Sequence, residues 1–198
     1  KVVPGRECLM RGRIIVGATG ASGMPLLLKC LELIKKEGKL ESWLILSDGA
    51  KLTLRQEMPK AEEKILELAD HVLENTEIGA GPASGSFRAA GMLIVPCSMK
   101  TVAGIHAGYG ENLILRAADV TIKEQRPLVL AARETPLSAI HLRNLSELSM
   151  IPGVRIIPPM MTFYHRPESI DEMVYHVAAK LVEPFGVEAE EYRRWTGI

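Results

Sequence analysis

Short apolar runs recur along the chain, and the stretches between them space their apolar residues three or four apart. The runs lie at 13–17, 43–47, 92–96, 128–132 and 154–157 and show almost no polar alternation. Such runs are typical of strands buried on both faces of a parallel sheet. The stretches between them predict helices that cover those faces.

Helical spacing and helix-start signals place the helices. Thr135 with Pro136 predicts an N-cap and first-turn proline, and Ser169 with Glu172 predicts a capping box. The apolar positions with helical spacing are Met24, Leu27, Leu28, Leu31 and Ile34, then Ala61, Ile65, Leu68, Ala69 and Val72, then Leu113, Ala117 and Val120. The alternation predicts one doubly wound α/β domain, Rossmann-like or flavodoxin-like, with helices on both faces. We expect residues 1–12 to be an N-terminal extension and 13–198 to be the domain.

Charge and composition exclude several partners. The 198 residues carry 24 Lys and Arg against 24 Asp and Glu, so no net field attracts nucleic acid or anionic lipid. No apolar run approaches the roughly 18–20 residues of a membrane span. The 47% hydrophobic content instead predicts apolar surface buried in a homo-oligomer. Cys8, Cys30 and Cys97 fit neither a disulfide framework nor a zinc cluster, which predicts a cytoplasmic protein.

A glycine-rich turn follows the first apolar run. It reads Gly17-Ala-Thr-Gly-Ala-Ser-Gly23 and matches neither the dinucleotide GxGxxG nor the P-loop GxxxxGK[ST]. Glycines let the backbone approach a ligand, and N–H groups at a helix N-terminus favour an anion. The turn therefore indicates a phosphate-bearing ligand, or a tight connection in which small residues serve packing alone.

Polar side chains follow each predicted strand. Ligands of doubly wound sheets bind outside the carboxyl ends of the strands, so these side chains should converge. Hydroxyl and cationic groups gathered at one edge suit a phosphate. The set comprises Thr19 and Ser22, Ser47, Ser98, Lys100 and Thr101, Arg133 and Glu134, and Tyr164, His165 and Arg166.

Other features have a purely structural interpretation as well as a functional one. Glu134 is either a carboxylate favoured at a helix start or a proton donor held near a cation. Cys97 directly follows an apolar run and is better explained as a buried thiol than as a nucleophile. Histidines and carboxylates show no metal-ligand spacing, so we expect no metal site.

Seven motifs occur in order along nearly the whole chain. They are GATGASG at 17–23, ASGSFRAAGM at 83–92, PCSMKTVAGI at 96–105, ENLILRAADV at 111–120, KEQRPLVL at 123–130, ARETPL at 132–137 and Tyr-x-Arg-Pro at 164–167. In this combination residues from about Arg13 to Trp195 resemble the UbiX-type flavin prenyltransferases, small subunits of UbiD-type aromatic-acid decarboxylase systems. A sister group of cysteine-decarboxylating flavoproteins has a PASANT-like segment at 96–101 and a PxMNxxMW segment, of which Pro159-Met160-Met161 lacks the asparagine and tryptophan.

The resemblance implies roles for matching residues. Contacts to flavin mononucleotide (FMN) fall on Gly20, Ala21, Ser22, Ser47, Ser98, Met99, Lys100, Thr101 and Arg133. Contacts to the prenyl donor fall on Tyr164, Lys180, Lys123, Arg116, Ser86 and Trp195, the last as a cover of the prenyl pocket. The implied catalytic residues are Glu134, for proton transfer, with Lys123 and Tyr164 at the donor phosphate.

The resemblance also implies a reaction and its partners. A dimethylallyl group passes from dimethylallyl phosphate, or the diphosphate, to N5 and C6 of reduced FMN without a metal. The prenylated FMN then serves a UbiD-type decarboxylase. We expect a homo-oligomer, such as a dodecamer, in which Tyr164 or Trp195 completes a neighbour's site. The alternatives are a flavin-dependent oxidative decarboxylase of a cysteine-containing substrate and a non-enzymatic flavin-binding subunit.

Overall fold

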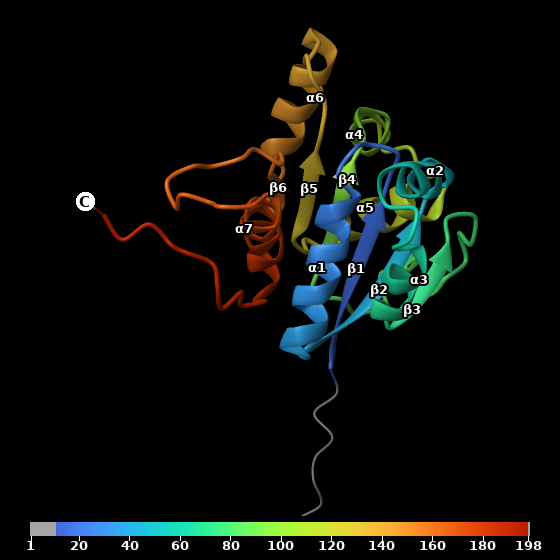
Figure 1. The fold of residues 1–198 in the computed structure, drawn as a ribbon. Coiled ribbons are helices and arrows are strands. Elements are labelled where there is room, and N and C mark those ends of the chain that lie inside the picture. Colours follow the sequence, from blue (N-terminus) through green and yellow to red (C-terminus); the bar gives the residue numbers. More distant parts are fainter. Residues whose placement is uncertain (1–10, 198) are drawn as a thin grey trace, which may run out of the picture.

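A single parallel sheet forms the centre of the molecule in the computed structural model, which describes residues 11–197 (Figure 1). Its strand order is β3-β2-β1-β4-β5-β6, and every neighbouring pair is parallel. The strands are β1 (Gly12–Ala18), β2 (Leu40–Leu46), β3 (His71–Glu74), β4 (Met92–Cys97), β5 (Leu128–Ala132) and β6 (Val154–Ile156). The predicted doubly wound sheet is confirmed, and the order is the Rossmann one, with its switch point between β1 and β4.

Helices cover both faces of the sheet and bury a core on each. One face packs against α1 (Met24–Glu37), α2 (Asp48–Glu57), α3 (Glu62–Leu68) and α7 (Ile170–Val182). The other packs against α4 (Met99–His106), α5 (Leu113–Lys123) and α6 (Ala139–Ser149). Short 3-10 turns, η1 (Gly81–Ala83) and η2 (Glu183–Phe185), lie before β4 and after α7. No helix within residues 11–197 is long and apolar enough to cross a membrane.

Strand β3 and helix α2 are absent from the sequence prediction. Val72, expected on a helix, lies in β3, because α3 ends at Leu68. As an edge strand, β3 pairs only with β2 and has no need of a continuous apolar run. In α2 only Ala50 and Leu54 are buried, so its sequence lacks a helical apolar stripe.

The predicted cap at Thr135 is wrong. Ser169 caps α7 as predicted, but the reciprocal bond of the predicted capping box does not form. Ser138 caps α6: its Oγ accepts from the His141 N–H at 3.2 Å, and the His141 ring nitrogen accepts from the Ser138 N–H at 3.3 Å. This reciprocal pair satisfies two free N–H groups and sets the helix start three residues later. Ser169 Oγ accepts from the Glu172 N–H at 3.2 Å, while Glu172 returns its bond to the N–H of Glu168.

Candidate functional site

The loops after β1 and β4 are tied together by Thr19. Its N–H and its hydroxyl both donate to the Pro96 carbonyl at 3.0 Å, and its Oγ1 accepts from the Ser98 N–H at 2.8 Å. The Thr19 side chain is 4% exposed, so these bonds form away from water. They fix the two loops that carry most of the predicted flavin residues.

The loops after β1 and β2 touch backbone to backbone. A Cβ added to Gly20 would lie 3.1 Å from the Cα of Gly49, and one added to Gly49 would lie 3.2 Å from the Cα of Gly20. Any side chain at either position would push the loops apart, which explains the glycine at each. The Ser47 N–H also donates to the Ala18 carbonyl at 3.1 Å.

Two helix N-termini open beside these loops. Ser47 caps α2 by accepting from the Ala50 N–H at 3.1 Å, and Ser98 caps α4 by accepting from the Thr101 N–H at 3.4 Å. The Ser98 and Thr101 hydroxyls are 3.1 Å apart. The structure therefore brings together five of the predicted flavin residues, Gly20, Ser47, Ser98, Lys100 and Thr101.

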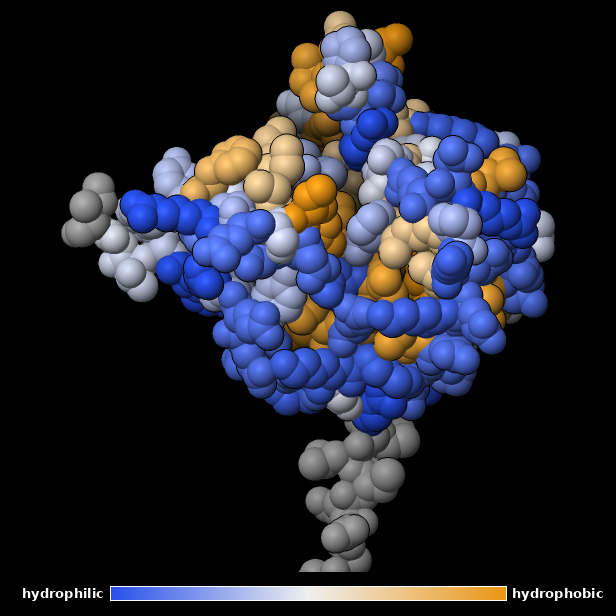
Figure 2. Space-filling view, viewed as in Figure 1, coloured by the Kyte–Doolittle hydropathy of each residue, from blue (hydrophilic) through white to orange (hydrophobic). Residues whose placement is uncertain are grey.

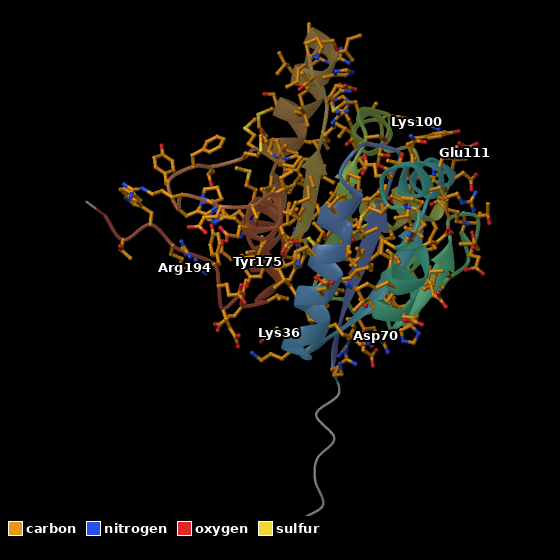
Figure 3. The ribbon with its side chains drawn as sticks, in the orientation of Figure 1. Lys36, Asp70, Lys100, Glu111, Tyr175 and Arg194 are labelled. Carbon is orange, nitrogen blue, oxygen red and sulfur yellow. The ribbon has the colours of Figure 1, made fainter. Side chains whose placement is uncertain are left out.

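A polar cavity of about 500 Å³ lies between these N-termini. Lys100 and Glu111 lie at the same end of the sheet, beside α4 and α2 (Figure 3). The cavity is lined by Thr19, Gly20, Ser47, Asp48, Gly49, Asn75, Ser98, Lys100, Thr101, Gly104, Tyr109, Glu111, Asn112, Ile114 and Leu115. The helix N-termini, the hydroxyl groups and Lys100 suit the cavity to a phosphate group. The carboxylates of Asp48 and Glu111 would repel an anion from the parts of the wall where they lie.

The remaining predicted flavin residues, Ala21, Ser22, Met99 and Arg133, are not part of the wall of this cavity. Ala21 and Met99 are buried, so they present little besides backbone. Ser22 faces a second cavity, described below. Arg133 directly follows β5, and its N–H donates to the Cys97 carbonyl at 3.0 Å. Its neighbour Glu134 is exposed, and its carboxylate accepts from the Thr135 N–H at 3.0 Å.

The anion at the N-terminus of α1 is the protein's own Glu57. Its carboxylate accepts from the N–H groups of Gly23 at 3.0 Å and Met24 at 2.9 Å. Partial burial raises the pKa of Glu57, but hydrogen bonds from Ser22, Gly23 and Met24 and the charge of Arg133 outweigh it and leave the pKa below its usual value. The glycine-rich turn therefore does not offer this N-terminus to a ligand phosphate. Glu57 was not predicted, because it ends a helix that the sequence pattern did not show.

An apolar groove adjoins the same turn, between α1 and α7. It encloses about 520 Å³, and Ser22 and Glu57 are the polar side chains on its wall. We name it the α1–α7 groove; it is lined by Ser22, Gly23, Pro25, Leu26, Glu57, Pro159, Met161, Ile170, Met173, Val174 and Val177. Figure 2 shows hydrophobic surface gathered between the positions of α1 and α7.

Tyr164 and Trp195 lie together on another part of the surface. Their ring centroids are 5.6 Å apart, and the side chains are 83% and 66% exposed. They line a cavity of about 310 Å³ that shares no residue with the polar cavity or the α1–α7 groove. Within one chain, Trp195 therefore covers Tyr164 rather than the flavin loops.

Lys123 and Lys180 lie at the amino ends of the strands, whereas the flavin loops follow the carboxyl ends of the strands. Lys123 ends α5, five residues before β5 begins, and pairs with Glu124 at 2.6 Å. Lys180 is near the end of α7 and pairs with Glu183 at 2.7 Å. The η2 turn that follows α7 reaches Gly91, at the start of β4. A single chain thus does not gather Lys123, Tyr164 and Lys180 around one phosphate.

Arg116 and Ser86 complete the predicted donor set. Arg116 lies in the first turn of α5 and pairs with Asp119 at 2.7 Å. The Ser86 hydroxyl is 2.9 Å from that of Ser84, in the loop whose Gly85 faces Lys123. Ser86 and Lys123 therefore lie near each other at the amino ends of the strands, whereas Arg116 lies near the carboxyl ends.

Sequence comparison places the chain in a family. A model of the Flavoprotein family matches residues 4–181. Flavin prenyltransferase LpdB of Lactiplantibacillus plantarum is 49% identical over 185 residues, which cover 93% of this chain and 98% of LpdB. The chain belongs to the UbiX-like flavin prenyltransferase family.

Two solved structures of UbiX-like proteins share the fold closely. A dodecameric FMN-dependent UbiX-like decarboxylase from Escherichia coli O157:H7 is 46% identical, with a TM-score of 0.90 over 93% of this chain and all of that one. AnUbiX (PadA1), crystallised with FMN and dimethylallyl pyrophosphate, is 41% identical, with a TM-score of 0.91 over 95% of this chain and 99% of that one. The resemblance found in the motifs is confirmed.

Proposed function

We propose that this chain is a flavin prenyltransferase that joins the dimethylallyl group of dimethylallyl phosphate to N5 and C6 of reduced FMN. The observation that carries the proposal is the meeting of Gly20, Ser47, Ser98 and Thr101 around one polar cavity in a chain of the UbiX-like family. These positions are the ones at which the sequence motifs imply flavin contacts.

The polar cavity fits the phosphate of FMN. The N-termini of α2 and α4 and the Lys100 side chain offer positive charge, and the Gly20–Gly49 contact lets backbone approach the ligand. The backbone of Ala21 and the side chain of Ser22 then face the ring system, and Arg133 lies at the end of β5. FMN supplies the nucleophilic nitrogen and carbon when it is bound in its reduced form, so the chain needs no nucleophile of its own.

The donor phosphate is held by Tyr164, Lys123 and Lys180 in this proposal. The allylic C–O bond breaks with its electron pair on the departing phosphate, and cations with a hydroxyl stabilise the charge that develops there. Arg116 and Ser86 add donors nearby, and Trp195 shields the prenyl group from water. The transferred group replaces the proton on N5. Ring closure to C6 consumes the remaining C=C bond, which gains a proton while C6 loses one, and Glu134 carries a proton in these steps.

Neighbouring copies of the chain must supply part of this set, because one chain separates Lys123 and Lys180 from the flavin loops. Large exposed apolar side chains support an assembly, among them Ile140, Met150, Met160, Phe163 and Tyr164, each more than 60% exposed. The E. coli relative is described as dodecameric. We propose a homo-oligomer of that kind, with each site shared between copies.

Anaerobic incubation with reduced FMN and dimethylallyl monophosphate tests the function. The expected product is prenylated FMN, identified by mass, and a parallel reaction with the diphosphate identifies the preferred donor. A UbiD-type decarboxylase added afterwards should gain activity from the product. Consumption of a cysteine-containing substrate with flavin reduction, or tight flavin binding without any product, would point instead to an oxidative decarboxylase or a flavin-binding subunit.

A further inference from the structure

Arg126 bonds to the backbone on both sides of Ser86. Its Nη1 donates to the Phe87 carbonyl at 2.7 Å, and its Nη2 donates to the Gly85 carbonyl at 2.8 Å. The Arg126 side chain is only 18% exposed, so water competes little for these bonds. The N–H groups of a guanidinium form a planar fork that reaches two carbonyls at once. Ser86 therefore lies between two peptide groups that one side chain anchors.

The end of α5 places Arg126 beside this loop. The N–H of Gln125 donates to the Ile122 carbonyl at 2.9 Å, and the N–H of Arg126 donates to the Thr121 carbonyl at 3.0 Å. Gln125 has a φ of 55°, the left-handed conformation usual for the first residue after a helix that ends in this way. These two bonds are those of a Schellman motif and fix the backbone of Arg126. Lys123 ends the same helix, so both cations share one support.

Lys123 and Glu124 contact the same loop at Gly85. A Cβ added to Gly85 would meet the Glu124 carboxylate and would lie 2.8 Å from Lys123 Nζ. Glu124 pairs with Lys123 at 2.6 Å, and its other oxygen lies 3.8 Å from Arg126 Nη2. Glycine at position 85 therefore lets the loop lie directly against the side chains that follow α5.

Further contacts hold the neighbours of Ser86. The Ser84 hydroxyl lies 2.9 Å from that of Ser86. The Phe87 ring packs edge-on against Trp43 of β2, with ring centroids 4.8 Å apart. Ser86 itself is exposed. An exposed hydroxyl on an anchored backbone can contact a ligand without the cost of ordering a loop, which strengthens binding.

We propose that Arg126 is a positioning residue for the prenyl donor, because it holds the Ser86 hydroxyl beside the Lys123 ammonium, where both can contact the donor phosphate. The inference rests on the proposed prenyl transfer. It adds a residue that acts through Ser86 rather than on the donor itself. Without the two bonds from Arg126, the loop samples other conformations, and donor binding has to order it.

A double-mutant cycle on Arg126 and Ser86 in the full chain tests this inference. The measured quantity is kcat/KM for dimethylallyl monophosphate with saturating reduced FMN under anaerobic conditions, and flavin affinity is titrated in parallel. Ser86→Ala and Arg126→Ala should each lower kcat/KM by about tenfold or more, since a hydrogen bond to a charged group is lost or misplaced. The double variant should lose little more than either single variant. Flavin affinity should stay parental.

Two further variants separate position from charge. Arg126→Lys keeps the charge but not the planar fork, so its kcat/KM should stay several-fold below that of the parent. Arg155→Ala, at an exposed arginine of β6, is the matched control and should leave kcat/KM unchanged.

The other outcomes decide against the inference. Parental kcat/KM in Arg126→Lys would assign the effect to charge alone, and losses that multiply in the double variant would show that Arg126 acts independently of Ser86. Parental kcat/KM in Ser86→Ala or Arg126→Ala also overturns the inference, while the proposed function stands. If Arg126→Ala loses its thermal transition, Arg126→Lys takes its place in the cycle. Absence of prenylated FMN from the unaltered chain refutes the proposed function itself, and this inference falls with it.

Discussion

Glu57 stabilises the start of α1 through charge as well as hydrogen bonds. We expect Glu57→Gln to lower the free energy of unfolding at pH 7 by about 1–2 kcal/mol, because a neutral amide interacts less strongly with the two N–H groups and the helix dipole. Chemical denaturation measures the difference. Glu67→Gln, at an exposed position of α3, is the matched control and should change stability little.

The pH dependence of that difference tests the cause. The pKa of Glu57 is lower in the folded chain than in the unfolded one. The contribution of Glu57 to the free energy of unfolding is therefore complete above the pKa of an unfolded glutamate, about 4.3. It is lost as the pH falls through the lower pKa of the folded chain. The gap between the parent and Glu57→Gln should close over that interval. A gap that stays constant from pH 7 to pH 3 would show that charge is not its source.

Glu134 is the residue at which proton transfer can be separated from flavin binding. Its carboxylate bonds only to the adjacent Thr135 N–H among the described residues, and the side chain is exposed. Glu134→Gln should bind FMN nearly as the parent does and form prenylated FMN roughly 10²–10⁴-fold more slowly. Flavin titration and single-turnover prenylation are measured side by side, with Glu67→Gln again as control. A parental rate contradicts the proton-transfer role, and loss of flavin binding makes Glu134 a structural residue.

The sequence predicts those site residues that follow a recognisable local pattern. It does not predict residues that only the fold brings to the site. Ser47 and Ser98 follow apolar strands, so the rule that ligands bind at strand ends identified them. Glu57 reaches the flavin turn from the far end of α2, and no local pattern shows that approach. The glycine-rich turn was correctly located, but its helix N-terminus binds this carboxylate.

At the scale of elements, an aromatic stack joins α7, the loop after β6 and the C-terminal segment. His176 on α7 lies parallel to His165 with ring centroids 4.1 Å apart, and its ring centroid is 4.6 Å from that of Tyr192, whose ring is tilted against it. The Glu191 N–H donates to the Tyr175 hydroxyl at 3.1 Å, and the Arg193 side chain donates to the His165 carbonyl at 3.2 Å. These contacts hold the chain around Tyr192 beside α7, and the chain then runs outward from the helix to the C-terminus (Figure 1).

Acidification should release this segment. Burial, and then the charge of His165, lower the pKa of His176, so the folded chain favours the neutral ring. The neutral His176 ring therefore stabilises the docked segment fully above the pKa of an unfolded histidine, about 6.5. This stabilisation is lost as the pH falls through the lower pKa of the folded chain. Other charged groups line the same cavity as His176 and affect the pH midpoint of the release. They are Asp171, Glu172, Glu190, Glu191 and Arg193.

Hydrogen exchange of residues 186–197 between pH 7.5 and pH 5 measures the release. Exchange should rise as the pH falls in the parent. His176→Phe keeps a stacked ring that does not titrate, so its exchange should depend far less on pH after correction for the intrinsic rate. His106→Gln, which removes a histidine that pairs with Glu147 instead, should behave as the parent does. The same pH midpoint in His176→Phe would assign the transition to another group.

Elements were predictable in proportion to how much apolar surface each buries. Strands β1, β4 and β5 are buried almost throughout, and α1 carries a full apolar stripe, so periodicity revealed them. The four residues of β3 are mostly exposed at the sheet edge. Pattern alone does not distinguish such a strand from the end of the preceding helix.

At the scale of the whole molecule, the proposed donor residues lie apart from the flavin loops within one chain, so the proposed reaction requires copies of the chain to assemble. Glu134 follows the carboxyl end of β5, whereas Lys180 lies near the η2 turn at the opposite edge of the sheet. The sequence motifs predict which residues act but carry no information on which copy of the chain supplies them. We therefore expect the light-scattering mass of the active protein to be a multiple of the 21.7 kDa chain. Full activity in a 21.7 kDa species would contradict a shared site.

Mixed assemblies show directly whether one site uses two copies. Glu134→Gln and Lys180→Ala should each prenylate FMN poorly alone, the first through slow proton transfer and the second through weak donor binding. Subunits of the two variants, dissociated, mixed in equal amounts and reassembled, should regain activity. About one site in four would then combine an intact Glu134 from one copy with an intact Lys180 from another, if the copies assort at random. A mixture no more active than its separate components would mean that Glu134 and Lys180 serve a site within one chain, and the shared-site proposal would be wrong.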